Sequence, residues 1–170
     1  LSCGVVLSVL VIWRVIPLNI TMTDYMLQAL TKAKDAARQG EVPVGAVIVD
    51  RVSGEVIAAA ANRCEQDHDP SAHAEIVVIR AACKAKGDVR LFDCDMYVTL
   101  EPCIMCYGAI IQSRIDHIVY GAQDPKAGVF SQPKLSNLLN LNHHPTSIGG
   151  ILADACGEKL TQFFLKRRAS

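Results

Sequence analysis

The chain contains two short motifs, His73-Ala74-Glu75 and Pro102-Cys103-Ile104-Met105-Cys106, whose first cysteine lies thirty residues after the histidine. Together they offer one imidazole and two thiolates, a ligand set that suits Zn²⁺. Each motif lies at a predicted helix start, and the positive end of a helix dipole favours thiolate over thiol. The two motifs therefore predict a fold in which the first turns of two helices meet around one metal ion.

Three protein ligands leave one position of a tetrahedral zinc site open. A structural zinc is closed by a fourth protein ligand, whereas a catalytic zinc leaves that position to water. Glu75 is two residues from His73, and residues two apart on a helix do not face each other. We therefore expect Glu75 to lie beside the water and to move protons, and not to bind the metal.

Each motif has less specific interpretations when it is considered alone. A Cys-x-x-Cys pair also occurs in redox sites, in structural zinc sites and as two buried thiols, and His-x-Glu occurs often by chance. Cys94 is also available as a fourth ligand, which would make the zinc structural. Spacing alone leaves these alternatives open.

The composition limits the class of protein. With 170 residues, of which 51% are apolar, the chain is long enough for one folded domain and too apolar to be disordered. The formal net charge is zero, so a nucleic acid could bind only through a local basic patch. Seven cysteines are an odd number, and two are needed as thiolates, which favours a reducing cytoplasm over a disulfide-bonded secreted protein.

Residues 1–21 form an N-terminal apolar extension that we do not expect to be part of the domain. The apolar run at residues 5–13 is short for a membrane span, and it lacks the basic start and cleavage site of a signal peptide. Met22 stands directly before a predicted helix start, so we interpret it as the true first residue. A membrane anchor is the alternative. We expect residues 22–170 to form the domain and to have no contact with a membrane.

Helical and strand patterns alternate from Thr23 onward, which predicts a layered α/β domain. We predict helices over residues 23–39, 72–86, 104–112 and 154–168, capped at the first two starts by Thr23 and Ser71. Strands are predicted over residues 44–49, 56–60, 94–100 and 116–120. Residues 121–133 are a loop, residues 135–141 a short helix or turn, and residues 148–152 are ambiguous.

The motifs together are the signature of zinc-dependent nucleobase deaminases. Over residues 23–168 the chain resembles the bacterial tRNA-specific adenosine deaminase family of the cytidine deaminase-like superfamily. The resemblance rests on the two motifs and on Glu41-Val42-Pro43-Val44-Gly45-Ala46-Val47, Asn62, Tyr97-Val98-Thr99-Leu100-Glu101, Gly108-Ala109, Ser113-Arg114-Ile115, Gly150-Ile151-Leu152-Ala153-Asp154 and Phe163-Phe164.

The resemblance implies a three-layer α/β/α sandwich around a five-stranded mixed sheet, one zinc per subunit and a homodimer. It implies hydrolysis of the wobble adenosine of a tRNA anticodon to inosine in the cytoplasm. His73, Cys103 and Cys106 would bind the metal, and Glu75 would be catalytic. Asn62 would bind the flipped adenine, Asp124 and Lys126 would lie in a loop that holds the anticodon stem-loop, and the helix with Phe163 and Arg167 would contact the RNA.

The chain departs from the family in this loop. It has Gln123 and Ala127 where the family usually has Arg and Thr, and Val129-Phe130-Ser131-Gln132-Pro133 where small residues are usual. A deaminase of a free base such as guanine or cytosine is therefore an alternative. A non-catalytic zinc-binding partner of a deaminase is a second, although it would fit best if Glu75 were replaced. The basic end of the last helix is equally explained by complementation of the helix dipole.

Overall fold

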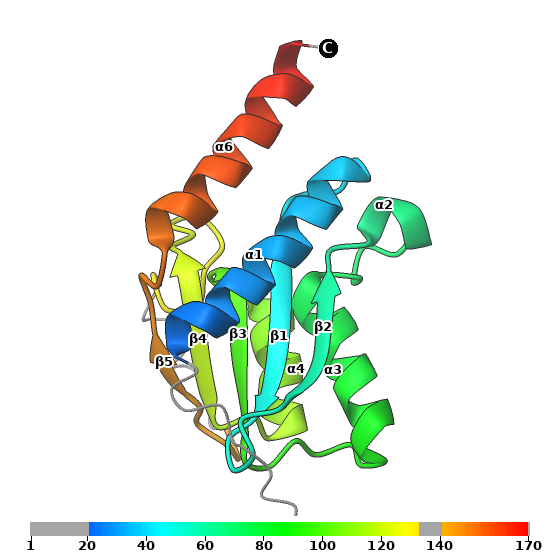
Figure 1. Cartoon of the computed structure of the whole chain (residues 1–170), viewed down its shortest axis with the longest axis vertical. Coiled ribbons are helices and arrows are strands. Elements are labelled where there is room, and N and C mark those ends of the chain that lie inside the picture. Colours follow the sequence, from blue (N-terminus) through cyan, green and yellow to red (C-terminus); the bar gives the residue numbers. More distant parts are fainter. Residues whose placement is uncertain (1–20, 133–140, 170) are drawn as a thin grey trace, which may run out of the picture.

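Five strands form one mixed sheet in the order β2-β1-β3-β4-β5 (Figure 1). The computed structural model describes residues 21–132 and 141–169. β1 pairs antiparallel with β2 and β3, whereas β3, β4 and β5 run parallel. The strands are β1 Gly45–Asp50, β2 Val56–Ala61, β3 Cys94–Leu100, β4 His117–Ala122 and β5 Thr146–Ile148.

Helices cover both faces of the sheet, so the expected three-layer α/β/α sandwich is confirmed. They are α1 Met22–Arg38, α2 Cys64–Asp67, α3 Ala74–Lys86, α4 Ile104–Ser113 and α6 Ala153–Ala169. Helices α1 and α6 lie on one face and α3 and α4 on the other (Figure 1). α6 also projects beyond the end of the sheet.

Alternate residues of the central strands supply the two halves of the core. In β1, Ala46 and Ile48 belong to the cluster that contains α3 and α4, while Val47 and Val49 pack with α1. This alternation has the period of two that side chains of a strand follow. Gly45 lets the start of β1 approach α1 closely, because a Cβ there would overlap the Ala29 carbonyl. The sheet therefore has little freedom to slide against its helices.

The parallel register of β3 and β4 brings their carboxyl ends to the same edge. Leu100 pairs with Ala122, and the Glu101 N–H donates to the Ala122 carbonyl at 2.9 Å. The connection to α4 leaves β3 at this edge, and the loop after β4 leaves it too. The sheet thus brings both segments together in the way that ligand sites of parallel strands are built.

The helix starts differ from the predictions in their caps. Thr21, not Thr23, caps α1, because its hydroxyl accepts from the Asp24 N–H while its own N–H donates to the Asp24 carboxylate. Ser71 does not cap α3; it bonds the Asp69 side chain, and His73 occupies the N-cap position without a capping side chain. That position leaves the imidazole free for another partner.

Two short elements were not predicted. Helix α2 precedes the break at residues 68–71, and β5 lies just before the glycines at 149 and 150. The prediction for residues 135–141 falls almost entirely outside the described residues, as does the apolar run at residues 5–13. None of the helices described has the length and apolar character needed to span a bilayer.

Candidate zinc-dependent active site

His73, Cys103 and Cys106 meet at one point, as the motifs predicted. His73 is the N-cap of α3 and Cys103 the N-cap of α4, and Cys106 lies in the first turn of α4. The Nδ1 atom of His73 lies 3.8 Å from Sγ of Cys103 and 3.5 Å from Sγ of Cys106. These three ligand atoms all lie within 4.8 Å of one another.

These distances fit a tetrahedral zinc ion. A nitrogen at about 2.0 Å and a sulfur at about 2.3 Å from one ion, separated by the tetrahedral angle, lie roughly 3.5 Å apart. Both nitrogen–sulfur distances in the structure are within a few tenths of an ångström of this value. The two thiols and the imidazole are therefore already placed as a ligand set for one zinc.

Proton sharing within this cluster prepares it for a cation. The pKa of Cys103 falls to about 4, mainly because the Cys106 thiol donates a hydrogen bond to its sulfur and also because of His73. The pKa of Cys106 rises for the same reason and because it is buried. The contact with Cys103 raises the pKa of His73. Zinc binding would displace the remaining protons, since thiolate and neutral imidazole are the ligand forms.

Glu75 is buried beside the three ligands. Its side chain is 4% exposed, and it lies in the first turn of α3. Burial raises the pKa of Glu75 to about 7, against the opposing effects of its own backbone N–H and the His73 charge. A carboxyl group that titrates near neutrality can both accept and donate a proton at physiological pH.

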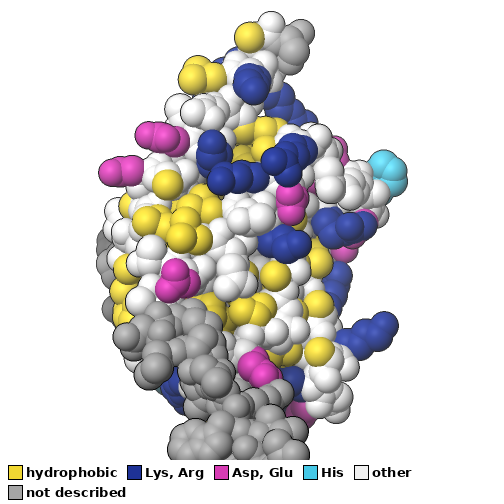
Figure 2. Space-filling model, viewed as in Figure 1, with side chains coloured by type: hydrophobic (Ala, Val, Ile, Leu, Met, Phe, Trp, Pro, Cys, Tyr) yellow, Lys and Arg dark blue, Asp and Glu magenta, His cyan; other side chains and the backbone are white. Residues whose placement is uncertain are grey.

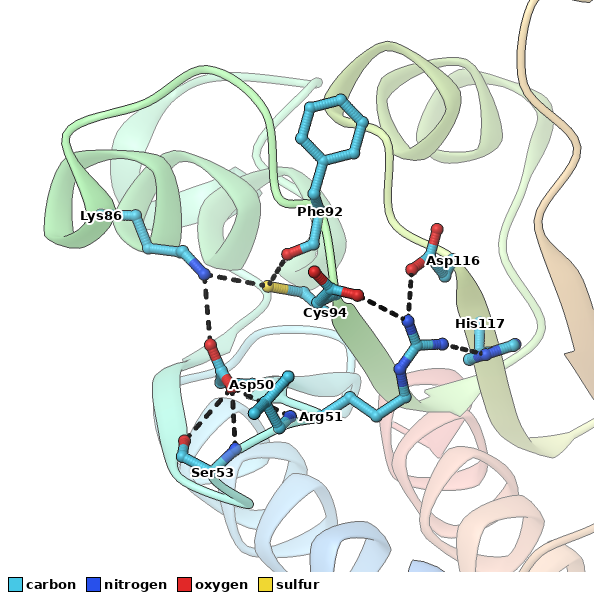
Figure 3. A network of polar contacts seen from close by, with 10 residues as sticks. Asp50, Arg51, Ser53, Lys86, Phe92, Cys94, Asp116 and His117 are labelled. Atoms are coloured by element: carbon cyan, nitrogen blue, oxygen red, sulfur yellow. Dashed lines mark hydrogen bonds and ion pairs between the residues drawn. The ribbon is translucent and has the colours of Figure 1, made fainter.

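Cys94 does not close the ligand set. It is the first residue of β3, and β3 separates it from the ligands by roughly 20 Å of strand. There its Sγ lies 3.8 Å from Lys86 Nζ, and Lys86 also contacts Asp50 (Figure 3). Among the described residues, His73, Cys103 and Cys106 are the only group found that could hold a metal. The site therefore keeps three protein ligands, which is the catalytic pattern.

Comparison with known proteins identifies the family. Residues 20–122 match the family model for the cytidine and deoxycytidylate deaminase zinc-binding region. The chain is 46% identical over 147 residues to the tRNA-specific adenosine deaminase of Bacillus subtilis, covering 85% of this chain and 89% of the relative. The chain belongs to the tRNA-specific adenosine deaminase family.

Solved structures of two kinds of deaminase resemble this member of the family. One is a tRNA:A34 deaminase that carries out A-to-I editing at the wobble position of transfer RNA. The two structures superpose with a TM-score of 0.77 at 44% sequence identity, and the match covers 81% of this chain and 99% of that chain. The other is guanine deaminase from Bacillus subtilis, with a TM-score of 0.59, 39% identity and coverage of 61% and 66%.

Asn62, the residue at which the family resemblance predicts base contact, is buried close to the ligands. Its side chain is 6% exposed. The next residue, Arg63, donates its N–H to the carbonyl of Ala72 at 3.0 Å, and Ala72 directly precedes His73. The Nδ2 atom of Asn62 donates to Glu41 at 3.3 Å. Glu41, which is fully buried and also accepts from the Gln66 N–H, was missed by the sequence analysis. The signal available was an acidic residue in the short segment between helix α1 and the buried strand β1.

Asp124 and Lys126 lie in the loop after β4, which we call the 123–132 loop. The Asp124 carboxylate accepts from the N–H groups of Lys126 and Ala127 at 3.0 Å each, so it shapes the loop itself. Lys126 is exposed. The loop lies against the metal motif, because the Val129 N–H donates to the Pro102 carbonyl at 3.1 Å.

Phe163 and Arg167 lie on the projecting part of α6. The Arg167 guanidinium stands 5.9 Å from the Phe163 ring centroid and 3.4 Å from the Glu65 carboxylate of α2. This ion pair joins α6 to the segment that follows Asn62. Lys and Arg side chains gather around apolar side chains on the upper part of the face in Figure 2. A local basic and aromatic surface thus exists on a chain of zero net charge.

Proposed function

We propose that the protein is a zinc-dependent deaminase that converts the wobble adenosine of a tRNA anticodon to inosine. The observation that carries the proposal is a buried Glu75 beside three ligand atoms spaced for one zinc, in a chain 46% identical to a tRNA-specific adenosine deaminase. A non-catalytic zinc module would have no use for a buried carboxyl group beside its metal, because burial disfavours the charged form.

The reaction consumes water and adenosine and releases ammonia. His73, Cys103 and Cys106 would hold the zinc, which would supply a Lewis acid that makes water nucleophilic near neutral pH. Glu75 accepts the proton of the attacking water and delivers it to the ring nitrogen beside C6 of adenine. Glu75 then takes the remaining proton of the added hydroxyl group and delivers it to the departing amine, so that ammonia leaves and C6 becomes a carbonyl. One residue thus serves as base and then as acid.

The substrate residues act before this chemistry. The target base must leave the stack to reach the buried Glu75, and a single-stranded anticodon loop lowers that cost. Asn62 binds the extruded base, the 123–132 loop with Asp124 and Lys126 holds the flanking nucleotides, and Phe163 and Arg167 contact the RNA from α6. Support for these roles is the position of each group around one edge of the sheet.

We further infer that the protein is a cytoplasmic homodimer. Ile104 and Met105 are 48% and 38% exposed at the start of α4, directly beside the ligand Cys103. We infer that these two exposed apolar side chains belong to the surface through which two subunits pair. The six cysteines of the described residues are free, which supports a reducing compartment. Light scattering of the purified protein would give the mass of a dimer.

The test of function is direct. The purified, zinc-loaded protein is incubated with unmodified tRNA carrying adenosine at the wobble position, and inosine is measured after digestion to nucleosides. Glu75→Ala is the control. Free guanine is tested in parallel, because the resemblance to a guanine deaminase makes it the second candidate substrate. Formation of xanthine from guanine without any inosine in the tRNA would contradict the proposed function and would show that the protein is a guanine deaminase.

A further inference from the structure

Glu101 is a buried carboxylate at the junction between the sheet and the metal motif. It follows the last residue of β3 and precedes Pro102 and Cys103, and it is 2% exposed. Its N–H donates to the Ala122 carbonyl at 2.9 Å, so its backbone is fixed to the end of β4. The side chain therefore starts from a rigid point two residues from a zinc ligand.

The 123–132 loop supplies the hydrogen bonds to this carboxylate. Near the start of the loop, the Asp124 N–H donates to Oε2 of Glu101 at 2.9 Å. Near its end, the Ser131 N–H donates to Oε1 and the Ser131 hydroxyl to Oε2, both at 2.5 Å. One carboxylate thus joins two points of the loop that are seven residues apart.

The middle of the loop lies over the same group. A Cβ at position 128 would overlap the Glu101 carboxyl carbon and oxygens, so only glycine permits this approach. Gly128 also forms an isolated antiparallel bridge with Cys103. The loop is therefore held at its two ends by Glu101 and at its middle against the zinc ligand itself.

A buried carboxylate is costly unless donors surround it. Here all three donors come from the loop, so displacement of the loop would remove these hydrogen bonds from Glu101. That penalty favours one loop position over others. The Asp124 side chain accepts hydrogen bonds from the N–H groups of Lys126 and Ala127 within the loop, so the loop keeps its own conformation. Glu101 then sets the position of the loop as a whole.

We propose that Glu101 is a positioning residue that sets the 123–132 loop against the zinc ligand Cys103 and thereby sets the affinity for the RNA substrate. It does not touch the reacting atoms. The proposal rests on the proposed function, because that function makes the loop an RNA-binding segment. Glu101 would act on substrate binding through the loop, and much less on the chemical step.

The first test needs no substrate. Hydrogen exchange of the 123–132 loop is compared by mass spectrometry in the zinc-loaded wild type and in Glu101→Gln, whose amide can no longer accept all three bonds. We expect about tenfold faster exchange in the variant, a smaller increase in Ser131→Ala, and one zinc per chain in both. The matched control is Ser113→Ala, which removes a buried serine hydroxyl bonded to the Ile110 carbonyl and should leave the loop unchanged.

The second test uses single-turnover deamination of tRNA. We expect Glu101→Gln to raise the half-saturating tRNA concentration about tenfold, and to change the rate at saturation less than threefold. A residue of merely structural value would lower the melting temperature without this split. Unchanged loop exchange, loss of zinc, or a reduced saturating rate at unchanged half-saturation would each overturn the proposal. If the wild type edits no tRNA, the proposed function fails, while the loop exchange still decides the role of Glu101.

Discussion

The Sγ atom of Cys106 lies 3.5 Å from Nδ1 of His73, although the two residues are 33 positions apart and belong to different helices. Helices α3 and α4 lie on the same face of the sheet, so their first turns can meet at its edge. The two residues are held at this distance by helices that pack into the core of the protein. A preformed ligand set loses less entropy when the metal binds.

Removing either thiol should abolish zinc binding. We expect Cys103→Ala and Cys106→Ala to reduce zinc affinity by more than about 100-fold, since even loss of a group that merely orients a ligand typically costs 10–100-fold. Zinc per chain is measured by elemental mass spectrometry after dialysis. Cys94→Ala is the matched control and should keep one zinc, because its thiol lies at the other end of β3. Stoichiometric zinc in both ligand variants would contradict the assignment.

Glu75→Gln should separate the metal from the chemistry. The amide fills the same buried space but cannot accept a proton from water, so turnover should fall by about 10² to 10⁴-fold. The zinc content should stay at one per chain. The assay is inosine formation at saturating tRNA, with zinc measured on the same samples. A variant that loses its zinc would show Glu75 to be a ligand instead.

The reactivity of Cys103 should depend on pH in an unusual way once zinc is removed. Its pKa of about 4 keeps it a thiolate at pH 5, where an ordinary cysteine with a pKa near 8.5 is protonated. We therefore expect iodoacetamide to label Cys103 at pH 5 and zinc to protect it. Burial raises the pKa of Cys156 to about 11, so Cys156 should stay unlabelled at pH 8. The sites are mapped by peptide mass spectrometry.

The opposite result is also informative. Labelling of Cys103 that begins only above pH 8 would mean that the Cys106 thiol does not donate to it. The low pKa also limits the absolute rate, because nucleophilicity falls as the pKa of a thiolate falls. The comparison is therefore between pH values for one cysteine, and not between different cysteines at one pH.

Much of this site could be predicted from the sequence because its information is local. The spacing in Pro102-Cys103-Ile104-Met105-Cys106 fixes two thiols on one helical turn, and the three-ligand count predicted an open zinc. The strand predictions over residues 44–49 and 94–100 likewise depend only on runs of neighbouring residues with strand propensity. The five-stranded mixed sheet was predicted from family resemblance, whereas the strand order and the parallel pairing of β3 with β4 were not predicted, since no local pattern carries them.

The features that could not be predicted from the sequence depend on contacts between residues that are far apart in the chain. Glu41 and Glu101 are buried acids whose partners lie 21 to 30 residues away. β5 has only three exposed residues, so it shows no alternation, and it exists because β4 offers an edge. The two predicted helix caps were wrong for a different reason. Ser71 bonds the side chain of Asp69 and does not cap α3. Thr21, two residues before Thr23, is the N-cap of α1.

The cap at Thr21 predicts where the N-terminal extension can be removed. Deleting residues 1–20 should leave zinc content, activity and melting temperature unchanged. Deleting residues 1–21 also removes the bonds between Thr21 and Asp24, which should cost about 1 kcal/mol and lower the melting temperature by about 3 °C. Thr21→Ala in the full chain should reproduce that shift. A shorter chain that fails to fold without residues 1–20 would show that the extension packs on the domain.

Arg167 and Glu65 offer a test of the RNA surface in both directions. The guanidinium lies 3.4 Å from the Glu65 carboxylate, with both side chains more than half exposed. A carboxylate so close competes with phosphate for the same cation. Arg167→Ala should therefore weaken tRNA binding and reduce the slope of log affinity against log salt by about one unit. Glu65→Gln should do the reverse and tighten binding, because it leaves more of the Arg167 charge for the RNA.

The control and the readouts make the test specific. Arg90→Ala removes an exposed arginine that lies beyond the far end of α3, so it should leave the slope unchanged. Binding is measured with catalytically inactive Glu75→Ala backgrounds across a salt series, and single-turnover rates are measured with active enzyme at saturating tRNA. These rates should be equal for all three surface variants, because a phosphate contact acts alike on bound substrate and transition state. If Arg167→Ala and Arg90→Ala gave equal slopes of log affinity against log salt, Arg167 of α6 would not contact the RNA. That result would favour the free base as substrate.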